Sequence, residues 1–236
     1  MSSPEDTPDN TPDNTPAINP LPPAVAALFL VLLGIEVIFG LASRGFIGGP
    51  EGVGWRTAAI QTYAFSDRVF DWMLETGRWP LEHVIRFFSY SFVHATFTHA
   101  LFAGVILLAM GKMVGEVFGQ LAFVIIFVLS GAFGALMYGL LLNDPVWLTG
   151  AFPSVYGLIG GFTYILWRSL SSVGANQARA FTLITFLMGF QLLFGLLFGT
   201  DNTWVADLSG FCMGFVLSII LAPGGWRDLM KRLRRG

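Results

Sequence analysis

Five side chains that could do chemistry stand in or beside long apolar stretches of this sequence. They are two acids, two histidines and a serine: Glu36, Asp207, His94, His99 and Ser154. A serine hydroxyl with a histidine as its base could attack an acyl group, and carboxylates and histidines could also carry protons. An acid at the centre of a membrane helix costs about 2.5–3.5 kcal/mol, so each such group requires a physical explanation.

The composition places these side chains in a membrane protein. The chain has 236 residues, of which 54% are hydrophobic and only 12% are charged, whereas soluble domains carry about 25% charged residues. The sequence therefore predicts one all-α integral membrane domain, and no nucleic-acid partner is expected. The single cysteine, Cys212, excludes an intramolecular disulfide.

Apolar stretches predict six helices across about 30 Å of hydrocarbon. They cover Ala24–Leu41 and residues 88–110, 118–142, 152–167, 180–199 and 203–222. The long connection at 43–86 is polar, with five arginines and five acids, and its aromatic residues alternate with charges. This pattern predicts short helices lying at the outer membrane interface. The membrane domain is thus expected to span residues 23–222.

Two tails flank the predicted membrane domain. Residues 1–22 repeat Thr-Pro-Asp-Asn and hold four acids but no basic residue, which predicts disorder. Residues 223–236 carry five basic residues, and with six spans both termini lie on one side, together with Lys112, Arg168 and Arg179. The positive-inside bias puts that side in the cytoplasm. We expect a multi-pass protein of a bacterial inner membrane, in contact with the lipid bilayer.

This topology puts the candidate side chains in the outer half of the bundle. At 1.5 Å per residue, His94 and His99 would lie about 9 and 17 Å into the second span, and Asp207 about 6 Å into the sixth. Glu36 would lie about 8 Å from the outer end of the first span, and Ser154 near the start of the fourth. The arrangement predicts a shared polar cavity open to the exterior; separate hydrogen bonds between helices are the alternative.

The spacing of the two histidines is not that of a helical zinc pair. Five residues turn a helix so that about 140° separates the two side chains, whereas helical zinc pairs are four residues apart. No metal and no cofactor is therefore expected. His99 and Ala103, four residues apart, share one face of the predicted helix.

Four motifs, taken in order, resemble those of the rhomboid family of intramembrane serine proteases. In that family the second span carries two histidines five residues apart and then an asparagine, and the third span is rich in small residues. The fourth span begins with a Gly-x-Ser-Gly segment, and the last span has a histidine before Gly-x-x-x-Gly. The matching segments here are 86–103, 129–134, 150–160 and 206–214. The resemblance covers about residues 80–222 and implies a six-transmembrane-helix rhomboid-like bundle.

The departures from this resemblance fall on the residues that carry the chemistry. Alignment puts Phe152 at the nucleophile, Asp207 at the base histidine, and Ala103 at the asparagine that helps to bind the oxyanion. Pro153 follows Phe152 and has no N–H to donate to an oxyanion. The two histidines of the second span match. Loss of the nucleophile or the base typically costs about 10⁴–10⁶ in rate.

Ser154 is a weak alternative nucleophile. It lies two residues after Phe152, and two residues turn a helix by about 200°, so its side chain would point away from the cavity. A role as N-terminal cap or small packing residue explains it better.

Three functional hypotheses follow. The leading one is an inactive rhomboid-like pseudoprotease that binds transmembrane segments of client membrane proteins. The alternative is an active intramembrane serine endopeptidase that uses Ser154 with a histidine of the second span. A small transporter with the ionisable groups as a proton path has the least support, because no inverted repeat is visible.

Two expectations concern the sixth span. Gly210 and Gly214 form a Gly-x-x-x-Gly pattern that lets helices approach closely, which predicts contact with the fourth span. Asp207 is expected to hydrogen-bond to His94 or His99, because all three are placed in the outer half of the bundle.

Overall fold

Helices form almost all of the chain that the computed structural model describes, which is residues 20–199 and 202–222. The predicted disordered and basic tails, 1–22 and 223–236, lie outside the described residues except for 20–22. The helices, in chain order, are α1 (Pro23–Ser43), α2 (Gly49–Gly52), α3 (Trp55–Tyr63), α4 (Asp67–Thr76), α5 (Leu81–Val84), α6 (Arg86–Ser89), η1 (Tyr90–Phe92), α7 (Phe97–Phe118), α8 (Gln120–Leu141), α9 (Phe152–Ser172), η2 (Gln177–Phe181), α10 (Thr182–Phe198) and α11 (Trp204–Leu221).

Six long helices form the bundle. Within the described residues, α1, α7, α8, α11 and the stretch Gln177–Leu197, which joins η2 to α10, are long and apolar enough to cross a membrane. The sixth long helix, α9, has 21 residues, and most of its first half is buried among the others. The protein is therefore an all-α integral membrane protein, and the described residues contain the six long helices that the sequence predicted.

The predicted start of the second span is wrong. The span was expected from residue 88, but α7 begins at Phe97. The backbone of Thr96 is extended, and its hydroxyl accepts a hydrogen bond from the N–H of His99 at 3.1 Å. Thr96 is thus an N-cap, a signal that the sequence carried. His94 precedes the helix, so the predicted depths of the histidines and the 140° between them do not apply.

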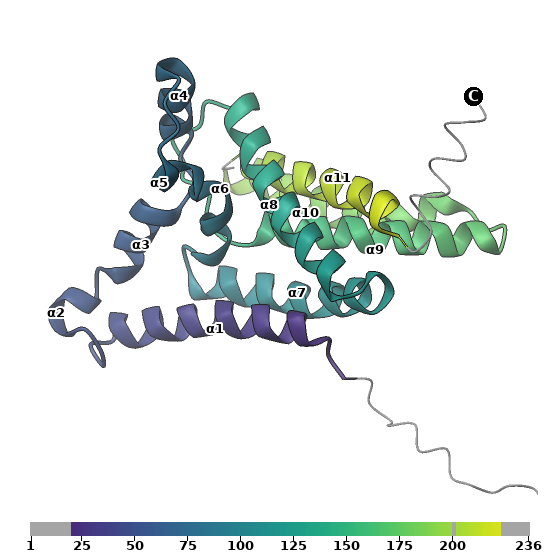
Figure 1. The fold of residues 1–236 in the computed structure, drawn as a ribbon, viewed down its shortest axis with the longest axis horizontal. Helices are drawn as coiled ribbons and strands as arrows, with labels where there is room; N and C mark the ends of the chain where they lie inside the picture. Colours follow the sequence, from purple (N-terminus) through teal and green to yellow (C-terminus); the bar gives the residue numbers. More distant parts are fainter. Residues whose placement is uncertain (1–19, 200–201, 223–236) are drawn as a thin grey trace, which may run out of the picture.

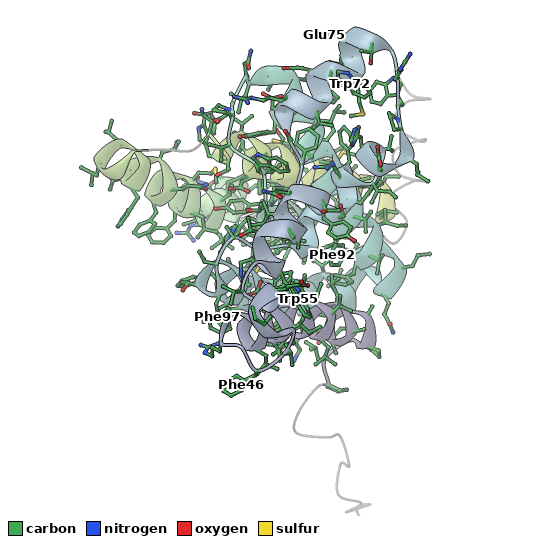
Figure 2. The ribbon with its side chains drawn as sticks, turned by 90° about the vertical axis from the view of Figure 1, so that its left-hand side faces the viewer. Phe46, Trp55, Trp72, Glu75, Phe92 and Phe97 are labelled. Carbon is green, nitrogen blue, oxygen red and sulfur yellow. The ribbon has the colours of Figure 1, made fainter. Side chains whose placement is uncertain are left out.

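The polar connection after α1 folds as an arm of short helices. Figure 1 shows α2 to α5 running from the end of α1 across one end of the bundle toward α8. Figure 2 looks onto that end, where Phe46 and Trp55 are exposed. The short helices were predicted, and their place at the membrane interface stays a prediction.

Hydrogen bonds and aromatic contacts dock the arm onto the bundle. Phe65 and Leu148 exchange two backbone hydrogen bonds, at 2.9 and 3.2 Å. The Phe65 ring also packs with Phe70 and with Tyr138 of α8. A carboxylate of the arm, Asp67, accepts a bond from the N–H of Asp144 at 2.8 Å. The connection between α8 and α9 is therefore fixed from the arm's side, just before α9 begins.

Helices α9 and α11 meet backbone to backbone. A side chain at Gly214 would collide with the backbone of Gly157, and one at Gly210 with the carbonyl of Pro153. The prediction that the two glycines face the fourth span is confirmed. Helix association in lipid depends on close packing rather than on the hydrophobic effect, so this seam is a main support of the bundle.

Candidate functional site

The site centres on the residues that lead into α9. Gly150 has φ of +87°, a conformation that glycine adopts without strain. A Cβ at this position would also lie 2.7 Å from His99 and 2.9 Å from His94. Both histidine rings therefore pack against the backbone at Gly150, which requires glycine there for two independent reasons.

Phe152 is the first residue of α9, and its ring lies on His99. The two ring centroids are 4.8 Å apart and the planes differ by 14°, which is a stacked geometry. The Phe152 ring also approaches Tyr156, one helical turn on, at 6.3 Å. The space beside the His99 imidazole is thus taken by a phenyl ring that has no polar atom.

His94 is fully buried in the turn before α7. Its Nε2 accepts a hydrogen bond from the N–H of Ala151 at 3.2 Å, so in the neutral ring the proton belongs on Nδ1. That atom lies 3.9 Å from a carboxylate oxygen of Glu36. Burial, followed by the nearby His99 and Arg56, lowers the pKa of His94 to about 3. His94 is therefore a neutral support for the start of α9.

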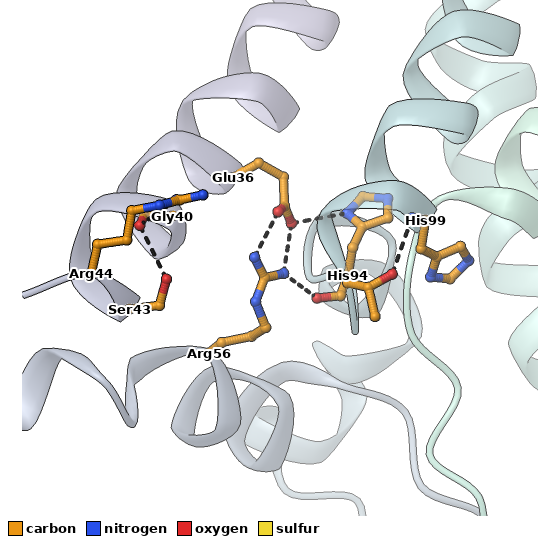
Figure 3. A network of polar contacts seen from close by, with 8 residues as sticks. Glu36, Gly40, Ser43, Arg44, Arg56, His94 and His99 are labelled. Carbon is orange, nitrogen blue, oxygen red and sulfur yellow. Dashed lines mark hydrogen bonds and ion pairs between the residues drawn. The ribbon is translucent and has the colours of Figure 1, made fainter.

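Glu36 has a partner that the sequence analysis missed. Arg56 of α3 donates to both of its carboxylate oxygens, at 3.0 and 2.8 Å, and also to the carbonyl of His94 at 2.6 Å (Figure 3). The guanidinium lies over the Phe39 ring at 5.0 Å. A bidentate pair of this kind stabilises a buried carboxylate. The sequence did carry one signal for such a partner, which is the acid itself. A carboxylate within a membrane span requires a positively charged side chain from elsewhere in the protein.

Asp207 belongs to a second network. The side-chain amide of Gln191 in α10 donates to its carboxylate at 2.9 Å, and the Tyr156 hydroxyl donates to the oxygen of the same amide at 3.3 Å. Side chains of α9, α10 and α11 are joined in this way. The predicted bond between Asp207 and His94 is wrong, because both ring nitrogens of His94 face other groups. A bond between Asp207 and His99 stays a prediction.

Ser154 is a packing residue in the first turn of α9. Its side chain is 1% exposed, and its Oγ lies 3.2 Å from the Oγ of Ser91. It fills the space that a side chain at Gly131 of α8 would need. The N-cap of α9 is Ala151, so the proposed capping role is wrong. The small-residue role fits the structure.

A comparison of the sequence with known families decides its membership. The Rhomboid domain model matches residues 81–224, which is more than half of the chain. The chain belongs to the rhomboid family.

Three proteins similar to this rhomboid-family chain are a bacterial one and two plant ones. RHOMBOID-like protein 2 of Arabidopsis thaliana is 29% identical over 143 residues, which are 60% of this chain and 44% of the relative. RHOMBOID-like protein 4 of the same plant is 27% identical over 139 residues, which are 58% of this chain and 34% of that relative. The rhomboid protein YdcA of Bacillus subtilis (strain 168) is 25% identical over 130 residues, which are 54% of this chain and 62% of that relative. The match thus spans between a third and a half of the two plant relatives' length.

Three of the ionisable residues of this rhomboid domain are almost inaccessible, since Glu36, His94 and Asp207 are 3%, 0% and 3% exposed. His99 is partly exposed, its ring packs edge-on against that of His94, and Glu36 lines a small pocket between α1 and α7. The separate hydrogen bonds between helices, which were the alternative, are present. A cavity shared by these groups and open to the exterior stays a prediction. Ala103 is also fully buried and packs in the core between α7 and its neighbours. The assignment of Phe152, Asp207 and Ala103 to family positions remains a prediction.

Proposed function

We propose that this rhomboid-family protein is proteolytically inactive and binds transmembrane segments of other membrane proteins. The stacking of Phe152 on His99 carries the proposal. A nucleophile must lie within hydrogen-bond reach of its base, at about 2.6–3.2 Å. The phenyl ring occupies one face of the imidazole and offers no atom that could attack a peptide bond.

Three neighbouring residues support the loss of catalysis. Pro153, at the second position of α9, has no N–H for an oxyanion. Ala103 is buried and has no polar side-chain atom. The carboxylate of Asp207 accepts a bond from Gln191, and a carboxylate is a poor proton acceptor from a serine near neutral pH. Each change removes a different part of acyl-transfer chemistry.

The alternative, an active endopeptidase that uses Ser154, has less support. The Ser154 hydroxyl lies against Ser91 and is nearly inaccessible. His94 would have to release Ala151 to act as its base. Both rearrangements would disturb the packing that holds the start of α9.

Helix α10 supports the binding part of the proposal. Ile184 and Met188 are buried, whereas Phe186 and Leu196 are 67% and 83% exposed. Lipid tails are as apolar as leucine, so a partner helix that replaces lipid along α10 loses little apolar contact. Close packing and a few polar groups would then decide affinity. Gln191, with its bond to Asp207, is a polar group near the middle of α10, whereas Thr182 and Thr185 near its start bond to backbone carbonyls of the preceding turn.

The experiment uses the full-length protein in proteoliposomes with a fluorescent synthetic transmembrane segment that has small residues at its outer edge. We expect saturable energy transfer, no cleavage, and no labelling by a serine-directed fluorophosphonate. A polyleucine segment is the control and should not saturate. Fluorophosphonate labelling that disappears in Ser154→Ala would overturn the inactive assignment. If energy transfer to the synthetic segment and to the polyleucine control were equal and did not saturate, the proposal that the protein binds client segments would be overturned.

A further inference from the structure

An apolar groove lies between α1 and the arm. Its volume is about 520 Å³. The opposite wall comes from α3 and from the turn before α7. A hydrogen bond from the Ser89 hydroxyl to the carbonyl of Tyr63, at 2.8 Å, ties these two parts of the wall together. The groove is separate from the histidines, and its apolar lining includes Val31, Ile35, Ile38 and Phe39 of α1 with Ala59 and Phe92 opposite.

The groove lies at the depth of the hydrocarbon. Helix α1 crosses the membrane and ends at Ser43, so Val31 and Phe39 lie about 18 and 6 Å from that end at 1.5 Å per residue. Val31 and Ile38 are 50% and 47% exposed, on a helix whose exposed apolar side chains contact lipid. The groove is therefore continuous with the lipid-facing surface of α1.

Position and polarity distinguish between the possible occupants. The groove is lined almost wholly by apolar side chains and opens onto the lipid-facing surface of α1. An acyl chain of the surrounding lipid can therefore enter it directly, whereas a partner helix would first have to displace that lipid. Water is a poor occupant because ordered water needs two to four polar partners. An empty groove would leave its lining without dispersion contacts on one side.

We propose that the groove binds one acyl chain of a phospholipid, from the leaflet that meets the arm. The cation at the groove's edge is Arg56, which stacks over Phe39 and is paired bidentately with Glu36. Its charge is compensated, so the site selects the chain and not the charge of the headgroup. The bound chain packs between α1 and α3. It thereby supports the helix that delivers Arg56 to Glu36 and to the carbonyl of His94.

The test is photo-crosslinking in nanodiscs. The full-length protein is reconstituted with phosphatidylcholine that carries a diazirine in the middle of one acyl chain, and in parallel with phosphatidylglycerol carrying the same group. We expect labelling of residues 31–39 and 59–63 with both lipids. Leu121, which is 74% exposed on α8, reports general contact with lipid and serves as the internal reference.

Matched variants separate the groove from the general lipid shell. Ala59→Trp fills the groove, whereas Ala58→Trp places the same ring at an exposed position of the same helix. Labelling of Ile35 and Phe39, which line the groove and are partly buried, should fall severalfold in the first variant and stay unchanged in the second. If Ala59→Trp fails to fold, Ile35→Trp and the exposed Val37→Trp replace the pair.

Three results would overturn the proposal. Equal labelling of Phe39 in the groove-filling and control variants would show that no chain enters the groove. Crosslinks there to an added transmembrane segment, in place of lipid, would assign the groove to a protein partner. A severalfold preference for phosphatidylglycerol would show that the headgroup charge is recognised after all.

Discussion

Phe152 and Arg56 contact opposite members of the histidine pair. The phenyl ring stacks on His99, and the guanidinium binds the carbonyl of His94 while it neutralises Glu36. The histidines are thus held by an apolar contact on one side and by an ion pair on the other. Neither contact resembles the proton-transfer geometry that a histidine base requires.

The Glu36–Arg56 pair is predicted to stabilise the protein more than any surface pair. Glu36→Gln leaves Arg56 without its counter-charge, and breaking a buried pair costs about 3–5 kcal/mol. We expect the lower end of this range, because the Arg56 side chain is 23% exposed. Thermal unfolding in detergent measures the change.

A matched control comes from α7. Glu116 lies 3.9 Å from Lys112, one turn earlier on the helix, and both side chains are about a third exposed. Glu116→Gln should cost no more than about 0.5 kcal/mol. Equal losses for Glu36→Gln and Glu116→Gln would mean that the pair between α1 and α3 has no special weight.

At the scale of helices, α9 is held on three sides by different means. Glycine contacts bring it onto α11, small side chains such as Ser130 and Ser154 fit it against α8, and Tyr156 reaches the amide of Gln191 on α10. Close backbone contact and interhelical hydrogen bonds are the usual supports of helices in lipid. The position of Phe152 follows from all three contacts.

Gly214→Leu should destabilise the bundle by about 1–3 kcal/mol, because a larger side chain overpacks a contact between two backbones. Gly189→Leu on α10 is the matched control, since a Cβ at Gly189 meets no atom within 4 Å. Thermal midpoints in detergent compare the two variants. If both variants unfold at the wild-type temperature, the seam between α9 and α11 tolerates separation and does not support the bundle.

The bond between Gln191 and Asp207 should be worth about 0.6–1.7 kcal/mol, which are the average and the maximum found for hydrogen bonds between membrane helices in double-mutant cycles. A double-mutant cycle on thermal stability, with Gln191→Leu and Asp207→Leu, isolates it. We expect the double variant to lose less than the sum of the two singles. The same cycle with His94→Phe in place of Gln191→Leu should be additive. Additivity in the Gln191 cycle would contradict the bond.

For the whole molecule, the two ends of the bundle differ. The arm and the start of α9 lie at one end, and the loop after α9 lies at the other (Figure 1). Among the described residues, Lys112 of α7, Arg168 of α9 and Arg179 of η2 lie toward the end away from the arm. The positive-inside bias then predicts that the arm faces the exterior.

Cysteine labelling tests this orientation. In a Cys212→Ser background, Leu81→Cys of the arm and Val173→Cys after α9 are nearly equally exposed, at 72% and 74% for the native residues. A membrane-impermeant maleimide should label the first in intact spheroplasts, and the second only after permeabilisation. The reverse pattern would place the arm in the cytoplasm.

The sequence alone determined the number of long helices, the polar arm and the contact through Gly210 and Gly214. These follow from local properties: runs of apolar residues, the density of charges, and the space that glycine leaves. It also indicated which side chains could do chemistry, because an ionisable residue in an apolar run is conspicuous.

Only the tertiary structure decided which of these side chains meet. Glu36 is bound by Arg56, 20 residues later in the chain, and Asp207 by Gln191. Neither Arg56 nor Gln191 belongs to a periodic pattern in the sequence that would have indicated this pairing. The capped turn before α7 places His94 ahead of the helix, so the depths inferred for the two histidines do not apply. Depth along a helix is a local quantity, whereas a partner is set by how the helices pack, so spacing in the chain could not supply it.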